Sequence, residues 1–208
     1  MSKQTPSQDF SYKVTNIFPV SIHSIIVNNY EEVKNALVEY CYEQRKNNPQ
    51  GRQVSNKGGG WQSEYKRMTD MNSILDSTIA TSIMNYLPII RNTPFNVSGW
   101  LNINPPGAYN RMHNHPDCHL SGVFWIKAPD KSGNIVFEHP NLYTSFIELQ
   151  TYTRKFKLEN KFDHMYSCTP IDGKILLFPG YLNHEVEENC SSEDRISYAF
   201  NVKFATEF

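Results

Sequence analysis

The hydrophobic pattern of this chain changes its period partway along. Between residues 30 and 87, two segments carry apolar residues every three to four positions. This period predicts two amphipathic helices, over 30–47 and 73–87, each with one apolar face to pack on a sheet. From Phe95 onward apolar and polar residues alternate, which is typical of strands. The alternation predicts strands over 95–104, 108–115, 120–127, 134–138, 174–178 and 195–204.

The order of these elements predicts one domain that is mainly β with flanking helices. We expect residues 1–94 to supply N-terminal strands and two supporting helices. Residues 95–208 would form a jelly-roll core, a double-stranded β-helix barrel built from short strands with turns between them. Residues 139–170 are expected to be an insertion, with an extra hairpin over 151–167. The short connection after residue 127 predicts a second hairpin, between the strands at 120–127 and 134–138.

Composition and charge argue against several classes of protein. The 208 residues carry a net charge of -1, so we expect no binding to nucleic acid or to an anionic membrane. The four cysteines show no CxxC pairing and are too few for a disulfide framework. The N-terminus has no apolar segment of the kind found in signal peptides, and no apolar run approaches membrane length, so we expect neither a signal peptide nor a membrane span. The cytoplasm is therefore the expected compartment.

Candidate metal ligands are concentrated in one short stretch. His113, His115, Asp117 and His119 stand at alternate positions, and alternate residues of a strand point to one face. Two neighbours from this row, together with the distant His184, would give three ligands on one side of a metal ion. Two histidines and one carboxylate in that layout leave positions open on Fe(II).

The near ligands can be chosen in two ways. One set is His115, Asp117 and His184, in which the anionic oxygen suits the charge and hardness of Fe(II). The other is His113, His115 and His184. We favour the first set, with His113 as an adjacent or reserve ligand. Pro116 keeps the second set open, since a proline in a strand marks an edge or a bulge that would turn one side chain out of line.

A carboxylate-binding pair follows His184 by about ten residues. Arg195 and Ser197 share one face of a predicted strand, opposite Ile196, Tyr198 and Phe200. A guanidinium grips a carboxylate through two parallel hydrogen bonds, and a neighbouring hydroxyl adds a third.

In this order and spacing, the motifs resemble those of the Fe(II)- and 2-oxoglutarate-dependent oxygenases. The strings HNHP, LSGVFWIKAP, FPGYLNHEV and RISYAFN resemble a little-characterised branch of this superfamily from bacteria and phages, over about 95–204. The resemblance implies that Fe(II) and 2-oxoglutarate are bound, the far carboxylate of the latter by Arg195 and Ser197. Two roles are open for Asn102, Asn104 and Tyr109: hydrogen bonds to the other end of the cosubstrate, or satisfaction of their own strand edges. That branch favours His-x-His-Pro, which again leaves the carboxylate ligand open.

The implied reaction uses dioxygen, hydroxylates an unidentified substrate and releases succinate and CO2, with ascorbate as a helper. The chemistry would belong to the iron, so no separate catalytic residue is expected. Two other hypotheses stay open: a cupin-like dioxygenase or isomerase that does not use 2-oxoglutarate, and a non-catalytic binding module. The glycine-rich segment Gly58–Trp61 is either a lid near the site or a loop pinned by one buried tryptophan. Trp125 is expected in the core.

Overall fold

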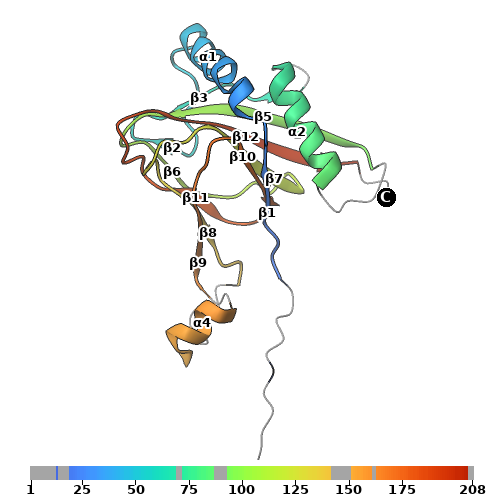
Figure 1. The fold of residues 1–208 in the computed structure, drawn as a ribbon, viewed down its shortest axis with the longest axis vertical. Coiled ribbons are helices and arrows are strands. Elements are labelled where there is room, and N and C mark those ends of the chain that lie inside the picture. The colour runs from blue at the N-terminus through green and yellow to red at the C-terminus, as the bar shows by residue number, and fades with distance from the viewer. Residues whose placement is uncertain are drawn as a thin grey trace, which may run out of the picture.

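The computed structural model describes residues 13, 19–68, 72–86, 93–141, 151–160 and 163–205. Their strands form two antiparallel sheets (Figure 1). The larger sheet has the order β1-β10-β7-β12-β5-β3, and β4 also pairs with β5. Its strands are β1 (His23–Ile26), β3 (Trp61–Gln62), β4 (Lys66–Arg67), β5 (Phe95–Asn104), β7 (Leu120–Lys127), β10 (Lys174–Pro179) and β12 (Arg195–Phe204).

The smaller sheet has the order β2-β6-β11-β8-β9. Its strands are β2 (Asn56–Lys57), β6 (Tyr109–His113), β8 (Ile135–Glu138), β9 (Met165–Cys168) and β11 (His184–Val186). The described part of the chain is therefore mainly β, as the alternation predicted.

Two helices cover the larger sheet on the face away from the smaller one (Figure 1). They are α1 (Glu31–Asn47) and α2 (Ser73–Tyr86), which lie where the helical period predicted them. Asn72 immediately precedes α2, and its Oδ1 accepts a hydrogen bond from the N–H of Ile74 at 2.9 Å. This is the usual way for a short polar side chain to cap a helix. The helices and the sheet share one core, in which Leu37 and Ile79 are fully buried.

Strands of the larger sheet are buried on both faces. On β10, Ile175 and Leu177 belong to the core under the helices, whereas Leu176 and Phe178 belong to a second core between the two sheets. Alternate side chains of a strand point to opposite faces, so one strand contributes to both cores. The inner faces of the two sheets thus enclose the space in which the site lies.

Two predicted hairpins are wrong. β7 and β8 belong to opposite sheets, because the turn that joins them carries the chain from one sheet to the other. The segment 151–167 contains a short helix, α4 (Arg154–Asn160), and β9 pairs with β8 instead. In Figure 1, α4 stands away from both sheets beyond β8 and β9. Residues 142–150 and 161–162 of the predicted insertion 139–170 lie outside the described residues.

The glycine-rich segment joins the edges of the two sheets. β2 pairs with β6 in one sheet, and β3 pairs with β5 in the other. Trp61 is buried in the core between the helices and the larger sheet, here called the helix-side core, and its Nε1 donates to the carbonyl of Asn48 at 2.9 Å. Gly58 has a φ of +64°, and a Cβ there would come within 2.3 Å of the Gly107 carbonyl oxygen. The segment is therefore a loop pinned by a buried tryptophan.

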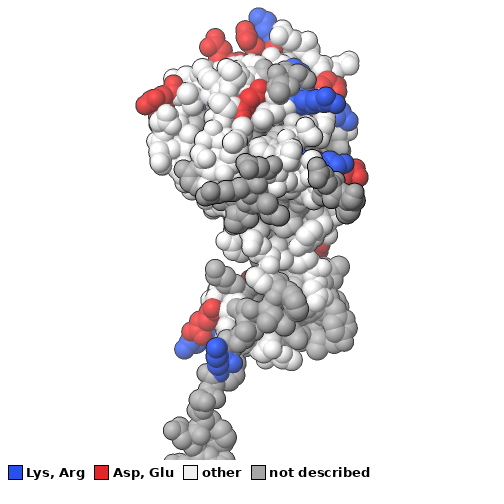
Figure 2. All heavy atoms as spheres, turned by 90° about the vertical axis from the view of Figure 1, so that its right-hand side faces the viewer, with Lys and Arg blue, Asp and Glu red and all other residues white. Residues whose placement is uncertain are grey.

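The described helices are all too short or too polar to cross a lipid bilayer. Figure 2 shows acidic and basic side chains interspersed among the described residues of one face, where they form no continuous patch of one sign.

Candidate metal and carboxylate site

Three histidines converge between the two sheets. His113 ends β6, His115 follows it by two residues, and His184 begins β11 directly opposite His113 in the strand register. The metal-binding ring atoms of all three lie within 4.8 Å of one another. The ring centroids of His113 and His184 are 4.4 Å apart. Three nitrogen donors this close can occupy one side of a single ion.

The backbone fixes the tautomers of two of these histidines. His113 Nδ1 lies 2.6 Å from the carbonyl oxygen of Arg111, and His184 Nδ1 lies 2.9 Å from that of Leu182. A carbonyl oxygen can only accept, so each Nδ1 must carry the proton. Each Nε2 is then left with a free lone pair, which is how metal-binding histidines are commonly oriented.

Burial also keeps the three imidazoles neutral. Desolvation lowers the pKa of His113, and it lowers the pKa of His115 to about 4 and of His184 to about 3. The neighbouring histidines lower the last two further, since protonated rings would repel one another. At neutral pH all three rings therefore have the form that binds a metal ion.

Asp117 lies outside this group. β6 ends at His113, and Pro116 and Asp117 form a turn in which the Asp117 side chain is exposed. The alternation that would have aligned Asp117 with His115 is therefore interrupted. His119 is also exposed, and its Nδ1 accepts from the N–H of Phe204 at 3.1 Å.

Gly180 allows His115 to approach the turn that leads to His184. The N–H of His115 donates to the Gly180 carbonyl at 2.8 Å. A Cβ on Gly180 would lie 2.6 Å from the Cys118 carbonyl oxygen and 2.7 Å from that of His115. No side chain fits there without moving the backbone that carries His115.

An irregularity in β6 decides which of its side chains face the site. His184 pairs with His113 and Val186 pairs with Asn110, so an advance of three residues along β6 lies opposite an advance of two along β11. Such a bulge reverses the alternation beyond it. Asn110 consequently lines the pocket together with His113, whereas Tyr109 is 36% exposed and lies outside the pocket lining. Asn110, which sequence reasoning missed, therefore lines the pocket where the prediction had Tyr109.

The pocket around the histidines extends to Arg195. It is lined by Ser55, Trp100, Asn102, Asn104, Asn110, His113, His115, Gly122, Val123, Trp125, Ile135, Phe178, His184, Val186, Arg195, Ser197, Ala199 and Phe200. Among the described residues of this lining, the ionisable groups are the three histidines and one arginine, with no carboxylate. The pocket therefore has a positive end and suits an anion.

Arg195 is buried with one nitrogen unused. Its side chain is 2% exposed, and Nη1 donates to the carbonyls of Ser132, Gly133 and Glu187, the last at 3.2 Å. Nη2 has no hydrogen-bond partner among the described residues. Burial lowers the pKa of Arg195 to about 10, so the guanidinium stays charged at neutral pH. A buried cation with an unsatisfied N–H is costly unless an anion joins it.

Other polar groups surround Arg195. Ser197 is buried on the same face of β12, opposite Asn102 of β5 in the strand register. The Oδ1 of Asn102 has no partner in the described structure. Deeper in the pocket, Asn104 Nδ2 donates to Asn110 Oδ1 at 3.3 Å, and Asn110 Nδ2 donates to Ser55 Oγ at 3.2 Å. This end of the pocket is polar and only partly satisfied.

The pocket wall next to the histidines is aromatic. Trp100 lies with its ring centroid 5.6 Å from that of His115 and stacks on Tyr65 at the same distance. Trp125 belongs to the core between the sheets, as predicted, and also lines the pocket. Trp100 and Ser55 were missed because neither is a ligand type. The alternation of β5, which aligns Trp100 with Asn102, was the available signal for the tryptophan.

One family model matches the sequence of this chain. A family model described as "Putative 2OG-Fe(II) oxygenase" matches residues 98–201, half of the 208-residue chain. No curated protein matches the sequence significantly. These results rest on sequence alone and are independent of the pocket.

Solved structures give the same fold at low identity. A Pseudomonas putida prolyl-4-hydroxylase is 12% identical with a TM-score of 0.59, covering 90% of this chain and 94% of its own. The epimerase SnoN, described as non-heme and alpha-ketoglutarate-dependent, is 13% identical with a TM-score of 0.59, over 90% and 77%. HygX from Streptomyces hygroscopicus, solved with nickel and 2-oxoglutarate, is 11% identical with a TM-score of 0.56, over 88% and 83%. At such identities the likeness concerns the fold.

Proposed function

Because the chain belongs to a family of 2OG-Fe(II) oxygenases, we propose that it hydroxylates its substrate at a centre held by three histidines. In this proposal the two facing sheets are the halves of a double-stranded β-helix, and the pocket between them is the active site. The observation that carries the proposal is the joint geometry of the pocket. One end has three convergent imidazoles, and the other has a buried guanidinium with an unused N–H.

We assign the metal to His113, His115 and His184. The fixed tautomers of His113 and His184 and the lowered pKa values of all three support this assignment. Asp117, the carboxylate that the sequence favoured, is exposed in a turn, which argues against it as the third ligand. Three neutral ligands leave the full charge of Fe(II) in the pocket, where a dianionic cosubstrate would balance it.

We assign the far carboxylate of 2-oxoglutarate to Arg195 and Ser197. The unpaired Nη2 and the absence of a carboxylate in the pocket lining support this, since a buried cation needs an anionic partner. Asn102 would face the same ligand from the opposite strand. The proposed role of Tyr109 is dropped in favour of Asn110, which lines the pocket.

When bound, Fe(II) supplies the open positions at which 2-oxoglutarate and dioxygen react, yielding succinate, CO2 and a hydroxylated substrate. The protein holds and orients the reactants and keeps water out. The ring centroid of Phe178 lies 4.8 Å from that of His184, and the ring centroid of Phe137 lies 6.0 Å from it. These rings form an apolar wall behind the imidazole, which strengthens electrostatic contacts inside the pocket.

The substrate group that reaches the metal is uncharged in this proposal. Trp100 presents an apolar ring beside His115, and the pocket lining has no carboxylate to receive a cation. A neutral carbon centre fits such surroundings.

The test combines metal analysis with succinate formation from 2-oxoglutarate under Fe(II) and ascorbate. We expect wild-type protein to bind a single metal ion and to release succinate. His113→Ala and His184→Ala should lose both, whereas His119→Ala, a change at an exposed histidine, and Asp117→Ala should keep both. If Asp117→Ala loses the metal while His113→Ala retains it, the triad contains the carboxylate.

One alternative keeps the metal but not 2-oxoglutarate. The three-histidine geometry would also suit a cupin-like dioxygenase. Such an enzyme would keep its activity when Arg195 is replaced, and it would release no succinate.

A further inference from the structure

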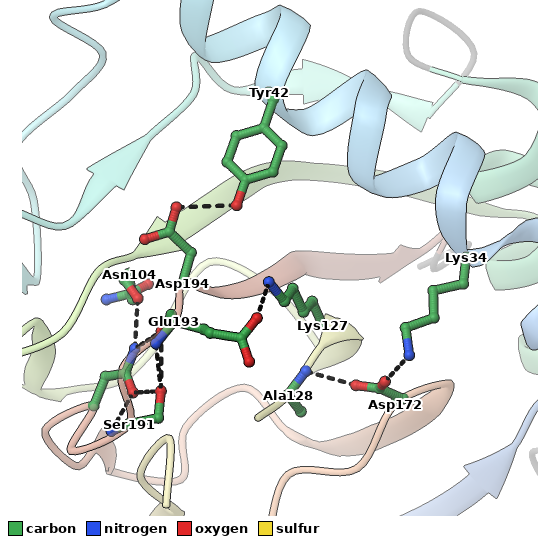
Figure 3. Close-up of polar contacts among 10 residues, drawn as sticks. Lys34, Tyr42, Asn104, Lys127, Ala128, Asp172, Ser191, Glu193 and Asp194 are labelled. Carbon is green, nitrogen blue, oxygen red and sulfur yellow. Dashed lines mark hydrogen bonds and ion pairs between the residues drawn. The ribbon is translucent and has the colours of Figure 1, made fainter. Parts of the chain in front are cut away.

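The loop that leads into Arg195 is tied to several parts of the fold. It runs from the end of β11 to the start of β12, over residues 187–194. At its beginning, the carbonyl of Glu187 accepts from Arg195 Nη1. Near its end, Glu193 pairs with Lys127 of β7 at 2.8 Å, and Asp194 accepts from the hydroxyl of Tyr42 on α1 at 3.1 Å (Figure 3). The last two contacts involve partly exposed side chains.

One buried side chain inside this loop uses all of its hydrogen-bonding groups. Asn189 is 1% exposed. Its Nδ2 donates to the carbonyl of Asn104 at 2.9 Å and to that of Glu193 at 2.8 Å. Its Oδ1 accepts from the N–H of Ser191 at 3.0 Å and from the Ser191 hydroxyl at 2.7 Å. An amide with two donors and two accepted bonds is fully satisfied.

The backbone of Asn189 adds a third connection. Its N–H donates to the carbonyl of Ala108 at 2.9 Å, and its own carbonyl accepts from the N–H of Gly107 at 2.8 Å. Ala108 immediately precedes β6, the strand that carries Asn110 and His113. Asn189 therefore links the end of β5, the turn before β6 and the start of β12.

These links meet at the carboxylate end of the pocket. Asn104 is the register partner of Arg195 on β5, and both line the pocket. Glu193, the second acceptor of the Asn189 amide, lies two residues before Arg195. The Asn189 side chain thus sets where β12 begins relative to β5, without touching the pocket itself.

We propose that Asn189 is a positioning residue for the cosubstrate, which holds Arg195 and Asn104 in the register that receives the far carboxylate. This inference rests on the proposed function. It predicts that loss of the Nδ2 donors weakens the binding of 2-oxoglutarate but not that of pyruvate. Pyruvate has the same 2-oxo acid head and lacks the far carboxylate, so it does not depend on where Arg195 lies.

The experiment is calorimetric titration of the Mn²⁺-loaded full-length protein with 2-oxoglutarate and, separately, with pyruvate. For Asn189→Ala we expect the dissociation constant for 2-oxoglutarate to rise about tenfold or more, the usual effect of removing an orienting partner. Asn189→Asp keeps an acceptor for Ser191 but cannot donate to Asn104 and Glu193, so it should behave like Asn189→Ala. Tyr42→Phe removes another hydrogen bond of the same loop, at an exposed position, and should bind like wild type.

The outcomes separate the two proposals. If Asn189→Ala and Asn189→Asp bind 2-oxoglutarate as wild type does, the positioning role is refuted and the proposed function stands. If a folded variant binds both 2-oxo acids equally more weakly, its effect does not act through the far carboxylate, and the positioning role is again refuted. If wild-type protein binds no 2-oxoglutarate, the proposed function fails and this inference with it. Should Asn189→Ala not fold, the Asn189→Asp titration decides.

Discussion

Replacing Arg195 by methionine tests the carboxylate end of the pocket directly. Methionine is long and unbranched, so it fills much of the space of the arginine stem while removing the charge. The guanidinium is 2% exposed, and its Nη2 has no partner within the described structure. An incoming carboxylate would therefore meet a desolvated, preoriented donor, where a charged hydrogen bond is strongest.

The expected loss follows from that burial. Removing one partner of a buried, hydrogen-bonded charge pair costs about 2–5 kcal/mol in binding. At about 1.4 kcal/mol for each factor of ten, this corresponds to a roughly 30-fold to several-thousandfold weaker affinity for 2-oxoglutarate. Affinity for pyruvate should hardly change, so the preference for 2-oxoglutarate over pyruvate should collapse.

The folded protein itself should tolerate the change moderately. Arg195→Met leaves three backbone carbonyls without their donor, those of Ser132, Gly133 and Glu187. It also removes a buried charge that lacks a full set of partners. We expect a destabilisation of about 1–3 kcal/mol, the cost of unsatisfied buried groups.

Titration of the Mn²⁺-loaded variant with both 2-oxo acids measures the binding effect, and denaturant unfolding measures stability. Arg45→Met is the matched control, since Arg45 is a partly exposed residue of α1 that pairs with Asp194. An unchanged preference for 2-oxoglutarate in Arg195→Met would refute the assignment of Arg195, whatever happens to activity.

Three further outcomes are expected. Gly180→Ala should weaken Mn²⁺ binding about tenfold, because its Cβ would lie 2.7 Å from the His115 carbonyl oxygen; an unchanged affinity would refute this. Leu176 lies between the sheets and is 1% exposed, so Leu176→Ala should lower the free energy of unfolding by about 2–5 kcal/mol. A loss below about 1 kcal/mol in urea-induced unfolding would contradict the core between the sheets. The metal-free protein should lose stability as the pH falls from about 6.5 toward 3, because unfolded His184 binds a proton near its ordinary pKa of 6.5 whereas the folded residue stays neutral down to a pKa of about 3. The slope from this group is about 1.4 kcal/mol per pH unit, and stability that stays flat over this range would show that His184 is not buried as a neutral ring.

The alternation of β12 gave the most reliable prediction of a site feature. It assigned Arg195 and Ser197 to one face, and both line the pocket; Tyr198 and Phe200, assigned to the other face, belong to the helix-side core, and Phe200 also reaches the pocket. The pattern is strong because β12 is long and both of its faces are buried. β5, over Phe95–Asn104, was equally clear for the same reason.

The row of candidate ligands was less predictable. The alternation from His113 to His119 is real in the sequence, but β6 ends at His113 and a turn follows. The bulge that brings Asn110 rather than Tyr109 into the pocket lining is not marked by a glycine or proline in the sequence of β6, because it depends on the pairing with β11. Short strands in long-range pairings are decided by their partners rather than by their own residues.

Connections between strands were the other weak point. The turn after β7 looks like a hairpin in sequence, yet it leads to the opposite sheet. Nothing local distinguishes the two cases, because the choice depends on which strands β7 pairs with elsewhere. Asn189 was missed for a related reason: an asparagine in a loop is common, and its bonds to the end of β5 and to the turn before β6 join segments about 80 positions away in the sequence.

The place of β12 in the larger sheet affects the order in which the molecule can be assembled. β12 is the last described strand, yet it lies between β7 and β5, with ten residues of β5 paired along its length. A ribosome delivers residues 95–127 long before this strand, so its two neighbours must wait for a shared partner. A nascent or truncated chain that ends before residue 195 has all three histidines but lacks the strand that carries Arg195 and Ser197 and joins β7 to β5. The architecture thus delays completion of the pocket until its last described strand has been translated.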